Sequence, residues 1–327
     1  MKQLMSLPLE AEVLNHTPDL AETCSALGCD GLEVVWSGDD FQTHVPQPLH
    51  IGYHLTFWPD WLDFWNSDEA ALLSKFGSQA AWTYFFGGPA GRDTLLDAYR
   101  ADLERAVAWG AEYVVFHVSD VSLEDGYTYR WLHTSEAVID AAAEAINLLL
   151  DGRAWPFIFL VENQWWPGFT FTNPVQTSRL LSAIHYENMG VMLDAGHLLN
   201  TNPDLTSEAE GVAYLHKMLE EHGDLCRFIH GIHLHQSLSG TYVKAHTGSL
   251  PNGWAEEADY LKRFSASYRH ILRIDTHAPW HDPAIVSVID RIGPEYLVHE
   301  LSGADCAQRL ERLRVQTETL RKGRMVR

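Results

Sequence analysis

Short apolar runs alternate with longer stretches of helical periodicity along the whole chain. This alternation is typical of βα units that build a parallel sheet. We predict strands at residues 4–7, 31–36, 50–57, 113–119, 156–163, 189–197, 227–236 and 295–301. Eight strand-like runs with helices between them favour a closed (β/α)8 TIM barrel over an open doubly wound sheet.

The helical stretches have recognisable ends and follow one another without a linker. Residues 134–150 begin with Thr134 as N-cap, and their apolar face starts at Ala137 and Ile139. No Pro-, Gly- or Ser-rich segment divides residues 1–327, so we expect a single barrel domain with a polar helix at about 303–323. Residues 269–277 are expected to form a short extra strand or a loop.

Several protein classes are disfavoured by what the chain lacks. No GxGxxG or GxxxxGK[ST] pattern follows the early strands, which disfavours nucleotide-binding forms of an open sheet. The four cysteines include no CxxC pair, so neither a disulfide framework nor a thiolate zinc site is expected. We find no signal-peptide pattern and no apolar run long enough for a membrane span, and we therefore expect a cytoplasmic location.

The charge balance bears on the partners of this chain. It carries 44 acidic against 23 basic residues, a formal net charge of −21 with histidine neutral. A strongly acidic protein repels phosphate backbones at long range. The composition therefore disfavours a nucleic-acid partner.

Polar side chains recur where the predicted strands end. In a parallel barrel the carboxyl ends of the strands converge on one mouth. The residues at these positions are His54, His117, Glu162, Asp194, His197, His233, His235 and Glu300. A single histidine in such a place is ordinarily a core residue, so the inference depends on the whole set.

The carboxylates of this set make the strongest argument for a metal. Glu162, Asp194 and Glu300 each follow a strongly apolar run, and carboxylates are seldom buried without a partner. Side by side at one mouth they would repel each other and raise their pKa values. A divalent cation removes this conflict, and Mn²⁺, Co²⁺, Mg²⁺ and Zn²⁺ all accept such oxygen and nitrogen ligands.

The chain resembles the xylose isomerase-like barrel superfamily, which includes sugar isomerases, sugar epimerases and the endonuclease IV type of repair enzyme. The residues that carry the resemblance follow the order of that superfamily. They are DGLEVVW (30–36), GYHLTF (52–57), VVFHVS (114–119), LVEN (160–163), MLDAGH (192–197), GIHLHQS (231–237), KAHTGSL (244–250) and LVHE (297–300).

The resemblance implies a set of metal ligands. Glu162, Asp194, His233 and Glu300 match the positions that bind one metal throughout the superfamily. Candidate residues for further metal ions, by analogy with the nucleases, are His54, His117, His197 and His246. His235 stands where asparagine is usual, and Lys244-Ala245-His246 stands where an Asp-x-His pair is expected for a third zinc. A charged lysine has no lone pair to offer a metal, so the nuclease activity is the weaker expectation.

The resemblance also implies a reaction and a substrate site. In sugar isomerases and epimerases a proton next to a carbonyl is exchanged by two carboxylates, and Glu162 and Glu300 match their positions. Predicted substrate-binding residues are His54, His117, Trp165, His197, His235 and Lys244. For Lys244, a solvated loop lysine is the more ordinary interpretation.

Three hypotheses follow for the function. The first is a metal-dependent isomerase or epimerase that acts on a small sugar or sugar phosphate through a metal-stabilised enediolate. The second is a zinc phosphoesterase of the endonuclease IV type, and the third is a barrel that binds metal without catalysis. The sequence leaves the sugar, the metal and the formation of a homo-oligomer open.

Overall fold

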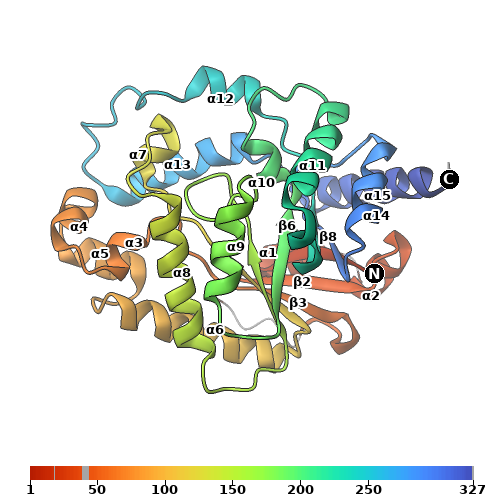
Figure 1. The fold of residues 1–327 in the computed structure, drawn as a ribbon, viewed down its shortest axis with the longest axis horizontal. Coiled ribbons are helices and arrows are strands. Elements are labelled where there is room, and N and C mark those ends of the chain that lie inside the picture. Colours follow the sequence, from red (N-terminus) through yellow and green to blue (C-terminus); the bar gives the residue numbers. More distant parts are fainter. Residues whose placement is uncertain (18, 39–43, 326–327) are drawn as a thin grey trace.

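The strands form one closed barrel in the order β1 to β8, and every neighbouring pair is parallel. The computed structural model describes residues 1–17, 19–38 and 44–325 (Figure 1). The strands are β1 (Lys2–Leu9), β2 (Gly31–Trp36), β3 (His50–His54), β4 (Tyr113–His117), β5 (Ile158–Glu162), β6 (Met189–Asp194), β7 (Ile229–Leu234) and β8 (Tyr296–His299). The predicted (β/α)8 TIM barrel is therefore confirmed.

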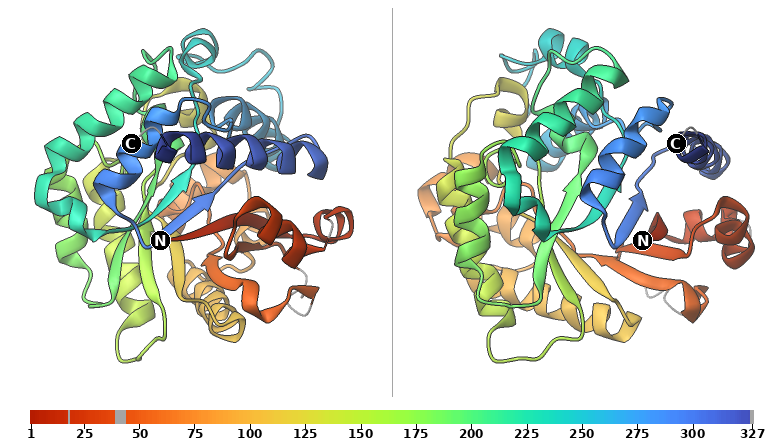
Figure 2. Two further views of the ribbon diagram at one scale, coloured as in Figure 1. Left: turned by 90° about the vertical axis from the view of Figure 1, so that its right-hand side faces the viewer. Right: turned by 45° about the vertical axis from the view of Figure 1, so that its right-hand side comes forward.

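Helices surround the barrel on its outside (Figure 2). Those that pack between the strand connections are α2 (Leu20–Leu27), α6 (Arg92–Trp109), α8 (Ser135–Leu150), α9 (Pro174–Ala183), α11 (Glu208–His222), α13 (Tyr260–Ile274), α14 (Val286–Ile292) and α15 (Cys306–Met325). The other helices are short and are α1 (Ala11–His16), α3 (Leu62–Trp65), α4 (Glu69–Phe76), α5 (Gln79–Phe86), α7 (Leu123–Thr128), α10 (Ala195–Asn200) and α12 (Gly240–His246). Among the described residues, none of the helices is both long and apolar enough to cross a bilayer.

Local sequence explains where these helices begin. Thr134 caps α8, because its side chain accepts a hydrogen bond from the backbone N–H of Ala137. Ser207 and Glu210 form a reciprocal capping box at the start of α11. The apolar side chains that follow each cap face the barrel and bury that side of the helix.

The core has two parts, one outside and one inside the barrel. The outer part fills the space between strands and helices. The inner part is a smaller cluster that fills the barrel itself, formed by Leu4, Ile51, Tyr113, Val115, Leu160, Met192, Tyr296 and Val298. The barrel is thus a packed core rather than a pore, and only its carboxyl end can hold a site.

Strand register brings the polar strand ends together. His117 of β4 pairs with Glu162 of β5, and Asp194 of β6 pairs with His233 of β7. In a parallel sheet, paired residues point to the same face. The register therefore lines one edge of the barrel with both carboxylates and imidazoles.

Two segments differ from the sequence-based expectation. Residues 269–277 do not form an extra strand; they are the end of α13 followed by a loop, because α13 buries Ser267, His270 and Ile274 at helical spacing. The C-terminal helix begins at Cys306 and continues to Met325, slightly later than the predicted 303–323.

Candidate metal centre

The central group of the mouth contains Glu162, Asp194 and His233. Their ligand atoms lie within 4.8 Å of one another. Glu300 joins the group through its Oε2, which is 3.1 Å from His233 Nδ1, while Glu162 Oε2 lies 3.4 Å from the same nitrogen. The structure thus brings together the four residues that the sequence proposed as ligands of one ion.

Asp194 shows how local structure prepares this group. It ends β6 and is the N-cap of α10, so its Oδ1 accepts a hydrogen bond from the His197 backbone N–H at 2.6 Å. Asn163 holds the Asp194 backbone on both sides, accepting from its N–H at 2.8 Å and donating to its carbonyl at 3.0 Å. Only Oδ2 is left for the centre of the mouth, where it lies 2.9 Å from His235 Nε2.

A second group flanks the centre on the β3–β4 side and contains His54, His117 and Glu162. The Nε2 atoms of the two histidines are 3.0 Å apart, and each lies 3.3 Å from Glu162 Oε2. Glu162 is therefore shared by the central and the flanking group. Such a shared carboxylate can bridge two cations.

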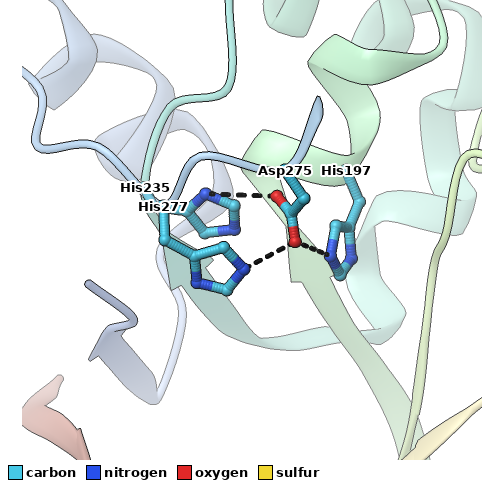
Figure 3. A group of neighbouring side chains, drawn as sticks. All are labelled: His197, His235, Asp275 and His277. Atoms are coloured by element: carbon cyan, nitrogen blue, oxygen red, sulfur yellow. Dashed lines mark hydrogen bonds and ion pairs between the residues drawn. The ribbon is translucent and has the colours of Figure 1, made fainter. Parts of the chain in front are cut away.

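A third group flanks the centre on the other side and contains His197, His235, Asp275 and His277 (Figure 3). Asp275 Oδ2 lies 2.6 Å from His277 Nε2 and 3.2 Å from His197 Nε2. The His235 ring stacks on the His277 ring at 4.0 Å, and its Nδ1 faces Asp275 Oδ1 at 4.0 Å. Three imidazoles and one carboxylate thus surround one point.

Backbone carbonyls fix the orientation of three of these rings. In each of them Nδ1–H donates to a backbone carbonyl at 2.9 to 3.1 Å. His54 donates to Leu55, His197 to Asn163 and His277 to Glu300. A carbonyl only accepts, so Nδ1 carries a proton and Nε2 is the nitrogen that faces the mouth, where it could give up a proton to bind a metal ion. Hydrogen bonds of this kind orient metal-binding histidines in known centres.

The third group corrects an expectation from the sequence. Lys244 and His246 lie on α12 and belong to none of the four candidate groups found among the described residues. Lys244 is more than half exposed and pairs with Asp204 at 2.7 Å. His246 is exposed, and its Nδ1–H donates to the Tyr242 carbonyl at 3.0 Å. Neither residue therefore joins the groups at the mouth.

Asp275 and His277 occupy that place instead, and the sequence argument missed them. They follow α13 directly, so that this short loop returns to the mouth beside β7. The signal was present as an acidic residue and a histidine two positions apart at 275–277. It was overlooked because residues 269–277 were expected to be a strand or a loop without chemistry.

Aromatic side chains border the mouth. Trp165 is almost fully buried, and its ring lies 5.2 Å from that of His197, beside Trp166. Phe57 stands on the opposite side, 4.2 Å from the His117 ring and 45% exposed. The mouth is thus covered on the Trp165 side and reaches solvent on the side of Phe57.

The electrostatics of the mouth depend on imidazole alone. Within the described part of the chain, no lysine or arginine forms an ion pair with Glu162, Asp194, Asp275 or Glu300. Burial by itself would raise the pKa of Glu162, but its interactions with the imidazoles of His117 and His233 hold it well below the usual value. Histidines, rather than permanent cations, therefore face the carboxylates of the mouth.

The donor set fits a divalent cation. His233 Nδ1 and Glu300 Oε2 are buried and lack a hydrogen-bond partner among the described residues, although they face each other at 3.1 Å. Buried polar atoms without partners are rare in native structures. An ion bound between these two atoms would satisfy both and would replace protons on the imidazoles.

Comparison with known proteins agrees with this architecture. Residues 21–301 match the family model described as xylose isomerase-like TIM barrel. No protein of curated function matches the chain significantly.

Among solved structures, a D-tagatose 3-epimerase-like protein is similar over 100% of this chain and 99% of its own, with a TM-score of 0.56 and 14% identity. A D-psicose 3-epimerase crystallised with D-fructose gives a TM-score of 0.53 at 13% identity, covering 100% and 99%. An L-ribulose 3-epimerase gives 0.51 at 12% identity, covering 98% and 97%. At such identities the likeness establishes the fold, and together with the family match it shows that the chain belongs to the xylose isomerase-like TIM barrel family.

Proposed function

We propose that this protein is a metal-dependent sugar isomerase or epimerase whose reaction takes place at the mouth of the barrel. The observation that carries the proposal is the central group, in which Glu162, Asp194, His233 and Glu300 converge and leave His233 Nδ1 and Glu300 Oε2 without partners. The epimerases with similar folds are named for the rearrangement of small sugars, which supports this substrate class.

These four residues would hold one divalent ion, such as Mn²⁺, Co²⁺, Mg²⁺ or Zn²⁺. When bound, such an ion supplies Lewis acidity that stabilises the negative charge of an enediolate. Their two carboxylates from β5 and the end of β8, Glu162 and Glu300, approach the same His233 nitrogen from different strands. Each has two oxygens, so each can bind the ion through one and exchange a proton through the other.

Glu162 and Glu300 differ in their surroundings. Glu162 is 1% exposed, and Gln164 Nε2–H donates to its Oε1 at 3.4 Å. The Glu300 side chain is 19% exposed, so it is the more accessible of the two carboxylates. We therefore assign to Glu300 the first proton transfer with an incoming sugar, and to Glu162 the transfer on the inner side.

The remaining mouth residues would bind the substrate. Trp165 closes the inner side with an apolar ring, and His197 lies beside it with Gln164 Nε2 at 3.0 Å from its Nδ1. Such a wall excludes water from a carbanionic reaction and orients a small ring. Lys244, which the sequence offered as a substrate-binding residue, pairs with Asp204 and has no part in this proposal.

Isotope exchange tests the proposal directly. The protein loaded with Mn²⁺ is incubated in D₂O with a panel of ketoses and aldoses, and loss of C–H signal next to the carbonyl is followed by NMR. We expect exchange with at least one sugar and a loss of more than about 100-fold in Glu300→Gln. The matched control is Glu311→Gln, which changes an exposed carboxylate of α15. Metal-loaded protein that exchanges no sugar of the panel would contradict the proposal.

The two flanking groups favour one second candidate, a metal-dependent phosphoesterase. His54 and His117 on one side, and Asp275 with His277 on the other, could hold further ions next to the central one. Neighbouring metal ions that share a carboxylate are suited to phosphoester hydrolysis. Two or three bound ions per chain together with nicking of abasic DNA would favour this reading. One ion and no cleavage would dismiss it.

A further inference from the structure

A carboxylate that the proposed reaction does not use lies inside the barrel beneath the mouth. Glu33 is on β2 and is fully buried. It faces His233 from below, with Oε1 2.9 Å and Oε2 3.1 Å from His233 Nε2. Within the described residues it forms no ion pair with lysine or arginine. A buried carboxylate in such a place requires a specific reason.

The hydrogen bonds of Glu33 determine which nitrogen of His233 faces the mouth. An ionised carboxylate only accepts hydrogen bonds, so the neutral His233 ring must carry its proton on Nε2. Nδ1 then has a free lone pair, and this atom points to Glu300 and Glu162 at 3.1 and 3.4 Å. In this arrangement the ring presents the unpartnered nitrogen of the central group as a ligand.

Tyr113 of β4 completes the arrangement from within the barrel. Its hydroxyl donates to Glu33 Oε2 at 2.7 Å, and both side chains are fully buried. Gly52 of β3 makes this contact possible. A Cβ at Gly52 would lie 2.4 Å from the Tyr113 hydroxyl oxygen and 3.0 Å from Glu33 Cβ. Tyr113, Glu33 and His233 thus form one chain of hydrogen bonds, and the missing side chain at Gly52 leaves room for it.

A second buried carboxylate shows what is special about Glu33. Asp102 of α6 is also fully buried and also accepts a tyrosine hydroxyl, from Tyr53 at 2.7 Å. Its other partners are the Thr56 backbone N–H and the guanidinium of Arg105 at 3.1 Å. Asp102 therefore has a permanent cation and anchors a loop, whereas the only basic side chain paired with Glu33 among the described residues is the imidazole of His233.

We propose that Glu33 is a positioning residue of the metal centre: it accepts the Nε2–H of His233, supported by Tyr113, and so presents His233 Nδ1 to the ion. The inference rests on the metal site of the proposed function but not on the identity of the sugar. A carboxylate behind a metal-binding histidine fixes its ring and raises its basicity, and its loss ordinarily weakens metal binding by about 10- to 100-fold.

The test compares metal affinity in matched variants. Full-length parent, Glu33→Gln, Tyr113→Phe and the control Asp102→Asn are stripped of metal, and the dissociation constant of Mn²⁺ is measured by electron paramagnetic resonance of the free ion. The unfolding temperature of each metal-free protein is recorded alongside. We expect Glu33→Gln to bind Mn²⁺ about 10- to 100-fold more weakly and Tyr113→Phe a few-fold more weakly. Asp102→Asn should lose stability but keep the parent affinity.

The outcomes separate this inference from the proposed function. Parent protein that binds Mn²⁺, with Glu33→Gln equal to it in affinity, overturns the inference and leaves the proposed function intact. A loss of affinity equally large in Asp102→Asn also overturns it, because the effect would then follow from general destabilisation. Parent protein that binds no divalent ion contradicts the metal dependence of the proposed function and overturns the inference as well.

Discussion

Two acidic clusters of this protein solve the same electrostatic problem in different ways. The outer cluster, formed by Asp60, Asp63, Lys75, Asp120 and His133, lies among the loops that follow β3 and β4. Lys75 Nζ binds Asp60 at 2.5 Å and Asp63 at 2.7 Å, and His133 binds Asp63 at 3.0 Å and Asp120 at 2.7 Å. Its carboxylates are thus neutralised by side chains of the chain itself.

The mouth cluster gathers carboxylates without such a cation. Its acidic members are Glu33, Glu162, Asp194, Asp275 and Glu300, and its partners are histidines. A lysine ammonium has no lone pair, whereas a neutral imidazole does. The outer cluster is therefore closed to metal, and the mouth cluster can exchange its protons for a divalent ion. The basic partner of a buried carboxylate therefore distinguishes the two clusters: a lysine makes a structural ion pair, and a histidine leaves the carboxylate available to a metal ion.

Removal of the outer cation should have the largest effect. Lys75→Met leaves Asp60 and Asp63 buried without their shared ammonium, and breaking a buried ion pair costs about 3–5 kcal/mol. Urea denaturation of the metal-free protein at pH 7.5 measures this loss. Lys217→Met, which removes an exposed lysine 3.7 Å from Glu221, is the control and should cost less than about 0.5 kcal/mol. Equal losses in the two variants would contradict the account of the outer cluster.

Loss of a carboxylate should weaken metal binding when it belongs to the mouth cluster and not when it belongs to the outer cluster. Asp194→Asn keeps the N-cap of α10, since asparagine is a good cap, but it replaces Oδ2 of the central group. We expect Mn²⁺ affinity to fall by more than about 100-fold, which exceeds the effect of losing a residue that only supports a metal ligand. Asp120→Asn in the outer cluster should leave the affinity unchanged. Calorimetric titration compares the two, and similar affinities in both variants would remove the distinction between the clusters.

The pH dependence of stability should reveal the outer cluster. Hydrogen bonds to Asp120 and Asp63 raise the pKa of His133 to about 10. The folded pKa lies above the unfolded value of about 6.5, so the stabilisation is complete below that value and is lost as the pH rises towards 10. His133→Gln should cost about 2 kcal/mol at pH 6 and much less at pH 10.5. A cost that does not change between these two pH values would show that His133 is uncharged in the fold.

A steric change at the mouth should have the smallest effect. A Cβ at Gly196 would lie 2.0 Å from the His235 ring, so Gly196→Ala must displace that imidazole from Asp194 and Asp275. We expect Mn²⁺ affinity to fall by about tenfold. Gly126→Ala is the control, because its Cβ would find ordinary contacts at 3.6 Å. Unchanged affinity in Gly196→Ala, with a shifted His235 in its crystal structure, would place that histidine outside the metal centre.

The strands and the central group could be predicted from the sequence because their signals are local. An apolar run that ends in Glu162 or Asp194 indicates both a buried strand and a polar end at the mouth. Parallel register then brings the ends of neighbouring strands together without further information. The fold and the polar strand ends therefore depended on patterns within a few positions, whereas the choice of Glu162, Asp194, His233 and Glu300 among those ends came from the resemblance to the superfamily.

The third group could not be placed in this way because a long segment separates its members along the chain. Residues 235 and 275 are separated by α12, α13 and the segment between them, and no periodicity in the sequence indicates that residue 275 lies at the mouth. The sequence favours Lys244 and His246 for this place because they follow β7 closely along the chain. The role of Glu33 was also hidden, since only the closed barrel shows that β2 faces His233 across its interior.

A crystal structure of the protein soaked in Mn²⁺, with anomalous diffraction recorded, tests the central claim most directly. The account predicts an anomalous peak at about 2.1 Å from Glu162, Asp194, His233 Nδ1 and Glu300. It also predicts that Lys75 still holds Asp60 and Asp63 without a peak beside them. Absence of a peak at the mouth, with the carboxylates still paired to protonated imidazoles, would contradict it.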